Sequence, residues 1–376
     1  MSDIKKNDDG TYSFVIDIGK DIFTGKRKQV RRKGFKTKRD AKEAIKNIML
    51  KAESEKSINK NVANSVFMEF FDSWLEHKKI AIQHSTYLRY KHTKRYLLEP
   101  YFKNIKIYQI DESILSEFIS SLVGRELAPS TIRRGWTTVR AVLKKAAKKH
   151  AFNMEICEDI LLPQMQNISN VWTEEQINNF LDAPNKHKKL SRHYNACAFA
   201  LLTGMRKQEV LGLRWRDVYF EEKLCHIQQT VTETENGFDV VSRGKTNSSL
   251  GKVALPDKAF YYLKRQKVQQ EIDKTLLEDN YEDQDLIFCR KDGKVLKPSL
   301  LNNGFRLVIK KLGLPHIRFH DLRHTHATYL LSKGINPKVI QERLRHKDIR
   351  TTLGIYGHAS LTMQKEAADL LDKRFN

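Results

Sequence analysis

The sequence predicts a mainly α-helical protein of several domains: an N-terminal β-sheet with one helix, a helical domain, and a C-terminal α+β domain. A chain of 376 residues exceeds what a single hydrophobic core usually serves. Alternating β patterns occur near the N-terminus and in one stretch at residues 223–255, whereas helical periodicity dominates the rest. We place the three domains at residues 1–60, 61–165 and 166–376.

The N-terminal domain begins with a strand pattern over residues 11–18, and Thr24-Gly25 offers a hairpin turn. Residues 26–35 then form a very basic strand pair. Thr37 can cap a helix over residues 39–52. A basic sheet backed by one helix can lay strands into a DNA groove, although a solvated basic edge that discourages aggregation is the plainer alternative.

The middle domain follows a polar segment, residues 54–64, which we interpret as a linker. Aromatic and aliphatic residues at helical spacing predict a helix from Phe67 to Leu75. Pro129 can start a second helix, with Ile132 and Trp136 on its apolar face. The opposite face of that helix is basic, and almost no acidic residue interrupts it. This favours a binding surface over an ordinary solvated face.

The net charge of +23 indicates a polyanionic partner, because each neutralised phosphate releases a condensed counterion. A peripheral membrane protein would concentrate its charge on one amphipathic helix, and here the basic residues are spread over the chain. The four cysteines form no Cys-x-x-Cys pair, so we expect no disulfide framework, no zinc site and a reducing cytoplasm as compartment. The candidate DNA-binding residues are Lys26, Arg27, Lys28, Arg31, Arg32, Arg133, Arg134, Arg140 and Lys144.

The C-terminal domain opens with Thr173, which can cap a helix and complete a capping box with Gln176. Its β-rich stretch covers residues 223–233, 238–242 and 252–255. We expect the last two strands to form a hairpin closed by the turn Thr246–Ser249.

Four short stretches in this domain carry candidate chemistry: residues 203–213, 244–249, 320–328 and 344–358. Each alone is weak evidence for a site, because an Arg followed by Glu at i+3 is usually a surface pair and a Tyr near a C-terminus usually packs. His320, His324 and His326 could instead be metal ligands, but no carboxylate or cysteine completes a set nearby. We therefore expect neither metal nor other cofactor.

Taken together and in this order, the four stretches resemble the catalytic domain of the tyrosine recombinases, the family of phage and conjugative-element integrases. Its signature is Arg, a hairpin Lys, His-x-x-Arg, a second His or Trp, and Tyr. The matching positions are Arg206, Lys245, His320, Arg323, His346 and Tyr356. Two positions depart from the pattern: Arg345 stands where a Leu-Gly-His triplet has Gly, and Gly251 stands where the hairpin often has Arg.

The resemblance implies a role for each residue. Tyr356 is the nucleophile, and Arg206 with Arg323 clamps the phosphate oxygens. His320 accepts the tyrosine proton, His346 donates a hydrogen bond to the phosphate, and Lys245 protonates the leaving 5′ oxygen. Glu209 supports Arg206, Asp321 is structural, and a helix expected over residues 363–375 docks on a neighbouring protomer or packs on its own domain.

The resemblance further implies an arm-type DNA-binding module, a SAM-like core-binding domain and a catalytic domain that together clamp duplex DNA. The function implied is site-specific integration and excision of a mobile element or prophage by a homotetramer on two attachment sites, with an excisionase and a host DNA-bending protein as further partners. Two rival classes remain open: a type IB topoisomerase or resolvase, and a non-catalytic DNA-binding protein.

Overall fold

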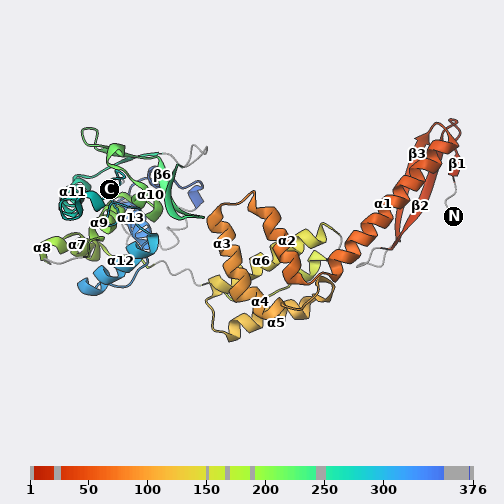
Figure 1. Ribbon diagram of the computed structural model, residues 1–376, viewed down its shortest axis with the longest axis horizontal. Coiled ribbons are helices and arrows are strands. Elements are labelled where there is room, and N and C mark those ends of the chain that lie inside the picture. The colour runs from red at the N-terminus through yellow and green to blue at the C-terminus, as the bar shows by residue number, and fades with distance from the viewer. Residues whose placement is uncertain are drawn as a thin grey trace. The chain divides into compact units, whose positions relative to one another are not determined.

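The computed structural model describes residues 4–20, 27–149, 152–165, 170–186, 191–242, 251–350 and Asp372. The chain divides into two compact units, residues 1–166 and 167–376, each of which has its own core (Figure 1). Several predicted features lie outside the described residues: Lys26, Lys245, Tyr356, the turns Thr24-Gly25 and Thr246–Ser249, and the helix expected over 363–375. Of the helices that are described, none is both long and apolar enough to cross a membrane.

The first unit begins with an antiparallel sheet of β1 (Ile4–Lys6), β2 (Tyr12–Lys20) and β3 (Arg27–Phe35), in the order β1-β2-β3. The basic stretch 26–35, predicted as a strand pair, is a single edge strand that pairs with β2. Phe14 and Ile16 on β2 are buried against Ala41 and Ile45 of the following helix. The sheet therefore has one face covered by a helix, as its alternating pattern predicts.

That helix, α1 (Lys38–Asn64), is longer than the sequence suggests. Thr37 caps it as predicted, and its side chain accepts a hydrogen bond from the Asp40 amide. The predicted linker 54–64 is wrong, because these residues continue the helix to Asn64. The segment is polar but contains neither Gly nor Pro, and its Lys, Glu and Ala residues have good helix propensity.

Around α2 (Phe67–Lys79) and α6 (Pro129–Ala147) lies the second core of this unit. Phe67 and Phe71 of α2 are fully buried, and so is the apolar stripe of α6 that includes Val139 and Leu143. Both helices begin where the sequence predicts. The remaining helical segments here are α3 (His84–Thr93), a π-helical turn (Lys94–Leu98), α4 (Glu99–Phe102), α5 (Glu112–Gly124) and 3-10 turns at Ile107–Gln109 and Met154–Cys157.

The second unit is built around α9 (Tyr194–Thr203), whose residues from Tyr194 to Leu201 are all buried. Four later helices of the unit, α10 to α13, pack against it. Thr173 caps α7 and forms the predicted capping box with Gln176. The helices are α7 (Glu174–Leu181), α8 (Ala183–Lys186), α9, α10 (Lys207–Gly212), α11 (Asp257–Leu277), α12 (Pro298–Leu312), α13 (Asp321–Ser332) and α14 (Pro337–Leu344), with 3-10 turns at Trp215–Asp217 and Glu278–Asn280.

Two small sheets complete this unit: β4 (Val218–Tyr219), β5 (Leu224–Ile227) and β8 (Gly251–Ala254) form one, and β6 (Gln229–Thr234) with β7 (Gly237–Ser242) the other. The predicted hairpin between the last two strands is wrong, because β7 pairs with β6 whereas β8 pairs with β5. A tight turn with Glu235 and Asn236 as its two loop residues returns the chain from β6 to β7, and Gly237, which pairs with Thr234, has φ +111°. Asn-Gly is the strongest short hairpin signal, and the sequence analysis overlooked it.

Candidate active site

Arg206 lies just before the first turn of α10, where Glu209 holds it by two hydrogen bonds. The carboxylate accepts the backbone N–H of Arg206 at 2.9 Å and its Nη1 at 2.8 Å. Arg206 Nη2 donates to the backbone oxygen of Arg345 at 3.1 Å. The Glu209 side chain is fully buried, which raises its pKa, but the charges of Arg345 and Arg206 outweigh this and the pKa is lowered overall. Glu209 thus supports Arg206 as an ion, which is the role expected for it above.

Arg323, on the first turn of α13, joins the ends of two other helices. Its Nη1 donates to the oxygen of Gly204 at 2.7 Å, and its Nη2 donates to the oxygen of Leu344. Both acceptors lie at helix C-termini, where the backbone carries partial negative charge. Gly204 has φ +67°, and a Cβ there would come within 2.5 Å of Leu344 and 2.7 Å of His326. Glycine at this position lets α9, α13 and α14 approach closely.

The two arginines therefore bind consecutive carbonyls, those of Leu344 and Arg345, and His346 follows immediately. Partial burial, then the charges of Arg323 and Arg206, lower the pKa of His346 to about 4. The pKa of His320 is also lowered, by loss of hydration and then by His324 and Arg323. Both imidazoles are therefore neutral at pH 7.

A polar open pocket of about 750 Å³ lies beside this group. Arg206 contributes to it with a side chain that is 32% exposed. The pocket is lined by Arg206, Lys338, Gln341, His346, Lys347, Asp348, Ile349 and Arg350. A phosphate would meet several cations here and one carboxylate, that of Asp348, which Arg350 already binds at 2.7 Å.

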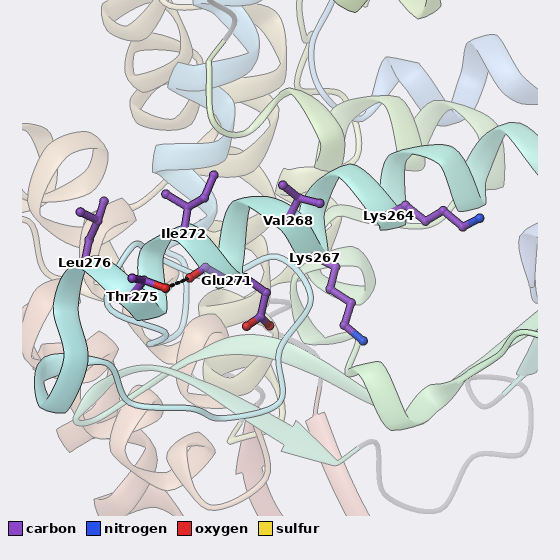
Figure 2. Close-up of a pocket in the computed structure, with 7 residues that line it drawn as sticks. All are labelled: Lys264, Lys267, Val268, Glu271, Ile272, Thr275 and Leu276. Carbon is purple, nitrogen blue, oxygen red and sulfur yellow. Dashed lines mark hydrogen bonds between the residues drawn. The ribbon is translucent and has the colours of Figure 1, made fainter.

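A second hollow, of about 710 Å³, lies along one face of α11. Figure 2 shows that its lining comes from a single helix, with the apolar side chains of Val268, Ile272 and Leu276 along it. These three side chains are exposed, and none of the candidate catalytic residues contributes to the lining. The polar pocket beside Arg206 is therefore the candidate active site.

The histidine cluster does not form a metal site in the part of the chain that the structure describes. There, no group of three or more His, Cys, Asp or Glu side chains is placed to hold an ion. His326 has both ring nitrogens engaged: Nδ1 lies 2.9 Å from the Leu201 oxygen, and Nε2 accepts from Arg343 Nε at 3.1 Å. His320 and His324 stack edge to face at 5.1 Å, and Asp321 is bound to Arg318.

Four of the six predicted catalytic residues are thus described and lie together: Arg206, His320, Arg323 and His346. Lys245 and Tyr356 lie outside the described residues. Sequence reasoning missed the role of Arg345, whose buried side chain binds Glu209 at 2.5 Å. It noted the residue only as a lost glycine, and the acidic partner was the available signal.

The predicted DNA-binding residues of β3 divide between the two faces of the sheet. Arg32 pairs with Phe14, which faces α1, whereas Arg31 pairs with Val15, which is 45% exposed on the other face. Because side chains alternate along a strand, Lys28 lies on the α1 side with Arg32, and Arg27 lies on the open face with Arg31. Lys33, which the prediction omitted, lies on the open face opposite Ser13. On α6, the side chains of Arg133, Arg134, Arg140 and Lys144 are all exposed, opposite the buried stripe.

Comparison with family models agrees with this organisation. The model of the phage integrase family matches residues 170–363. An arm DNA-binding domain matches residues 4–52, and the N-terminal SAM-like domain of phage integrases matches residues 66–123. The matches fall on the sheet with α1, on the helical core, and on the unit that holds the polar pocket.

Individual proteins are similar over most of the chain. The ICEBs1 integrase of Bacillus subtilis (strain 168) is 26% identical over 373 residues, which cover 98% of this chain and 99% of that protein. A structure of the Tn1549 transposon integrase with a circular intermediate DNA has a TM-score of 0.70, at 21% identity, over 81% of this chain and 99% of that one. A lambda integrase tetramer bound to a Holliday junction has a TM-score of 0.56, at 17% identity, over 94% of each chain.

The chain belongs to the phage integrase family of tyrosine recombinases. It is a site-specific DNA recombinase that integrates and excises mobile DNA.

Proposed function

We propose that this integrase cuts and rejoins DNA through a 3′-phosphotyrosyl intermediate on Tyr356. The observation that carries the proposal is the polar pocket at the end of α14. There Arg206 and Arg323 bind consecutive carbonyls and His346 comes directly after them. These three side chains come from three parts of the sequence and converge on one pocket. His346 lies ten residues before Tyr356 in the sequence. Convergent cations are what a phosphodiester needs before a neutral hydroxyl can attack it.

The arginines stabilise the charge that develops on the phosphate. Arg206 is partly exposed and lines the pocket, so it reaches a phosphate with little rearrangement. Arg323 is only 3% exposed, so its contact with a phosphate requires the end of α14 to move. An arginine that acts on a transferring phosphoryl group can raise the reaction rate about a thousandfold.

Proton transfers accompany the two bond changes. The Tyr356 oxygen bonds to phosphorus while the bond from phosphorus to the 5′ oxygen breaks. His320, neutral because its pKa is lowered, accepts the tyrosine proton. Lys245 donates a proton to the leaving 5′ oxygen, and His346 donates a hydrogen bond to the phosphate. Rejoining reverses these steps with a different 5′ hydroxyl.

The reaction needs neither ATP nor a metal ion. The phosphotyrosine bond keeps the energy of the phosphodiester that it replaces, so ligation requires no other source. The two arginines neutralise charge that a metal would neutralise in many phosphoryl-transfer enzymes, and His346 adds a hydrogen bond to the phosphate.

The rest of the chain selects and holds DNA. We propose three domains with separate tasks. Residues 1–60 bind arm-type sites, residues 61–165 bind core sites, and residues 166–376 cut the DNA. The open face of the β1-β2-β3 sheet and the exposed face of α6 are the proposed contact surfaces. A homotetramer holds two attachment sites in the bacterial cytoplasm, with an excisionase and a DNA-bending protein to set direction.

A trapped covalent adduct tests the proposal. A nicked suicide core site loses its short 5′ fragment after cleavage, so the protein should stay on the DNA through its tyrosine. The wild-type protein should form this adduct in excess EDTA, and Tyr356→Phe should bind the same DNA but form none.

Tyr329→Phe is the matched control, because Tyr329 is on α13 and its hydroxyl bonds only weakly to Glu174, at 3.5 Å. It should form the adduct normally. Adduct formation by Tyr356→Phe would identify another nucleophile, and activity that EDTA removes and magnesium or zinc restores would contradict metal-independent cleavage.

A further inference from the structure

The end of α14 has an unusual residue for its backbone conformation. Arg345 has φ +56° and ψ 46°, the left-handed region. The amides of Arg345 and His346 donate to the oxygens of Glu342 and Gln341, which closes the helix in the way that glycine usually does. A side chain at such a position is strained relative to glycine.

The Arg345 side chain brings further costs. It is 6% exposed, and burial lowers the pKa of its guanidinium. Nη2 lies 2.5 Å from Glu209 Oε2, and Nη1 donates to the Arg343 oxygen at 3.1 Å. Nε is buried without a hydrogen-bond partner among the described residues. Strained backbone and an unpaired buried donor both reduce stability, so stability does not account for arginine at this position.

Arg345 is connected to Arg206 by two routes. Its backbone oxygen accepts Arg206 Nη2. Its guanidinium shares the Glu209 carboxylate with Arg206, since Oε2 binds Arg345 and Oε1 binds Arg206. Glu209 is fully buried, so neither water nor another side chain can replace a lost partner easily. The orientation of the Arg206 guanidinium therefore depends on Arg345.

Gly251, at the start of β8, provides the space for this arrangement. A Cβ at Gly251 would lie 2.8 Å from Arg345 Cδ, closer than real Cβ atoms approach. Gly251 does not adopt a left-handed backbone, so it is needed for its lack of a side chain. The two departures from the family pattern are thus in contact with one another.

We propose that Arg345 is a positioning residue for DNA cleavage: it fixes Glu209 and thereby Arg206, and Gly251 is its required counterpart. The proposal rests on the proposed role of Arg206 at the phosphate. Arg345 itself is too buried to contact DNA, so its effect is on the rate of cleavage and not on the affinity for the site.

Single-turnover adduct formation on the suicide core site, at saturating DNA, measures this effect. Arg345→Met keeps an unbranched apolar stem but removes the charge, and it should slow the adduct by about tenfold to a hundredfold, the range for a displaced catalytic group. The Kd for the site should stay within about twofold, since the phosphate contacts remain. Arg345→Lys should recover part of the rate, because an ammonium can still reach Glu209. Arg345→Gly suits the left-handed backbone, so it tests the same loss while relieving the backbone strain.

The decisive measurement repeats Arg345→Met in an Arg206→Ala background. If Arg345 acts through Arg206, the double variant should cleave at the rate of Arg206→Ala alone. A further slowing equal to that seen in the wild type would mean an independent role and would overturn the inference, as would normal rates for both Arg345→Met and Arg345→Gly. A normal rate for Arg206→Ala would instead refute the proposed role of Arg206.

The contact with Gly251 gives a second, independent test. Gly251→Ala should slow cleavage in the wild-type protein, because the new methyl displaces the Arg345 side chain. In the Arg345→Gly background the same change should have no effect, because the obstructed side chain is absent. Equal slowing in both backgrounds would show that Gly251 does not act through Arg345.

Discussion

His326 is buried as a neutral imidazole, and the pH dependence of stability should reveal it. Its side chain is 8% exposed, and burial, followed by the charge of Arg343, lowers its pKa to about 3. Nδ1 donates to Leu201, and Nε2 accepts from Arg343. A proton on Nε2 would remove that acceptor and place an imidazolium against a guanidinium.

The size of the effect follows from the two pKa values. In the unfolded chain a histidine has a pKa of about 6.5. Below that pH the unfolded state therefore binds a proton that the folded state does not bind. The stability from His326 is therefore complete above pH 6.5 and is lost as the pH falls towards 3. Between pH 7 and pH 5 the loss amounts to about 2 kcal/mol, at about 1.4 kcal/mol per pH unit below 6.5.

Urea unfolding of the wild type and of His326→Gln, each at pH 7 and pH 5, measures this loss. Glutamine can still donate to Leu201 and accept from Arg343, but it does not titrate in this range. The other histidines with lowered pKa, His193, His320, His324 and His346, contribute equally to both proteins. The wild type should lose about 2 kcal/mol more than the variant over this interval. An equal loss in both proteins would refute the assignment of a neutral buried imidazole.

Two further predictions concern catalysis and DNA binding. Lys245→Ala should slow cleavage of ordinary DNA by about a hundredfold if a positioned acid is lost, but should cleave a 5′-bridging phosphorothiolate at nearly the wild-type rate. Equal defects on both substrates would assign Lys245 to DNA binding, with Lys252 the next candidate acid. Replacing Arg31 and Lys33 together by Ala should lower the salt slope of arm-site binding by up to about two, at about 0.9 per phosphate contact. The matched pair Lys28 and Arg32, on the α1 side of the same strand, should lower it less, and the reverse order would place DNA on the other face.

The sequence alone predicts those elements whose causes are local. The helices that begin at Phe67 and Pro129 follow from apolar spacing, and the caps at Thr37 and Thr173 depend on partners three residues away. The convergence of Arg206, His320, Arg323 and His346 could be anticipated only by resemblance to a family, because their contacts span up to 139 residues.

The wrong predictions concern features that are not determined by the local pattern from which they were inferred. Residues 54–64 were predicted as a linker from their polarity, but polarity without Gly or Pro does not end a helix. The partner of β8 is β5, and nothing within the segment 238–255 specifies that pairing. Arg345 was read as a missing glycine, since neither its left-handed backbone nor its distant partner Glu209 can be seen in the local sequence.

The bonds that hold the two arginines also bear on when this enzyme becomes able to cut DNA during its synthesis. Arg323 donates hydrogen bonds to the oxygens of Gly204, 119 residues earlier, and of Leu344. Arg206 donates to the oxygen of Arg345, which is synthesised later than Arg206. The basic sheet and the helical core of residues 1–166 leave the ribosome long before these partners exist. A nascent chain can therefore fold the proposed DNA-contact surfaces of residues 1–166 before the proposed catalytic arginines are held in position.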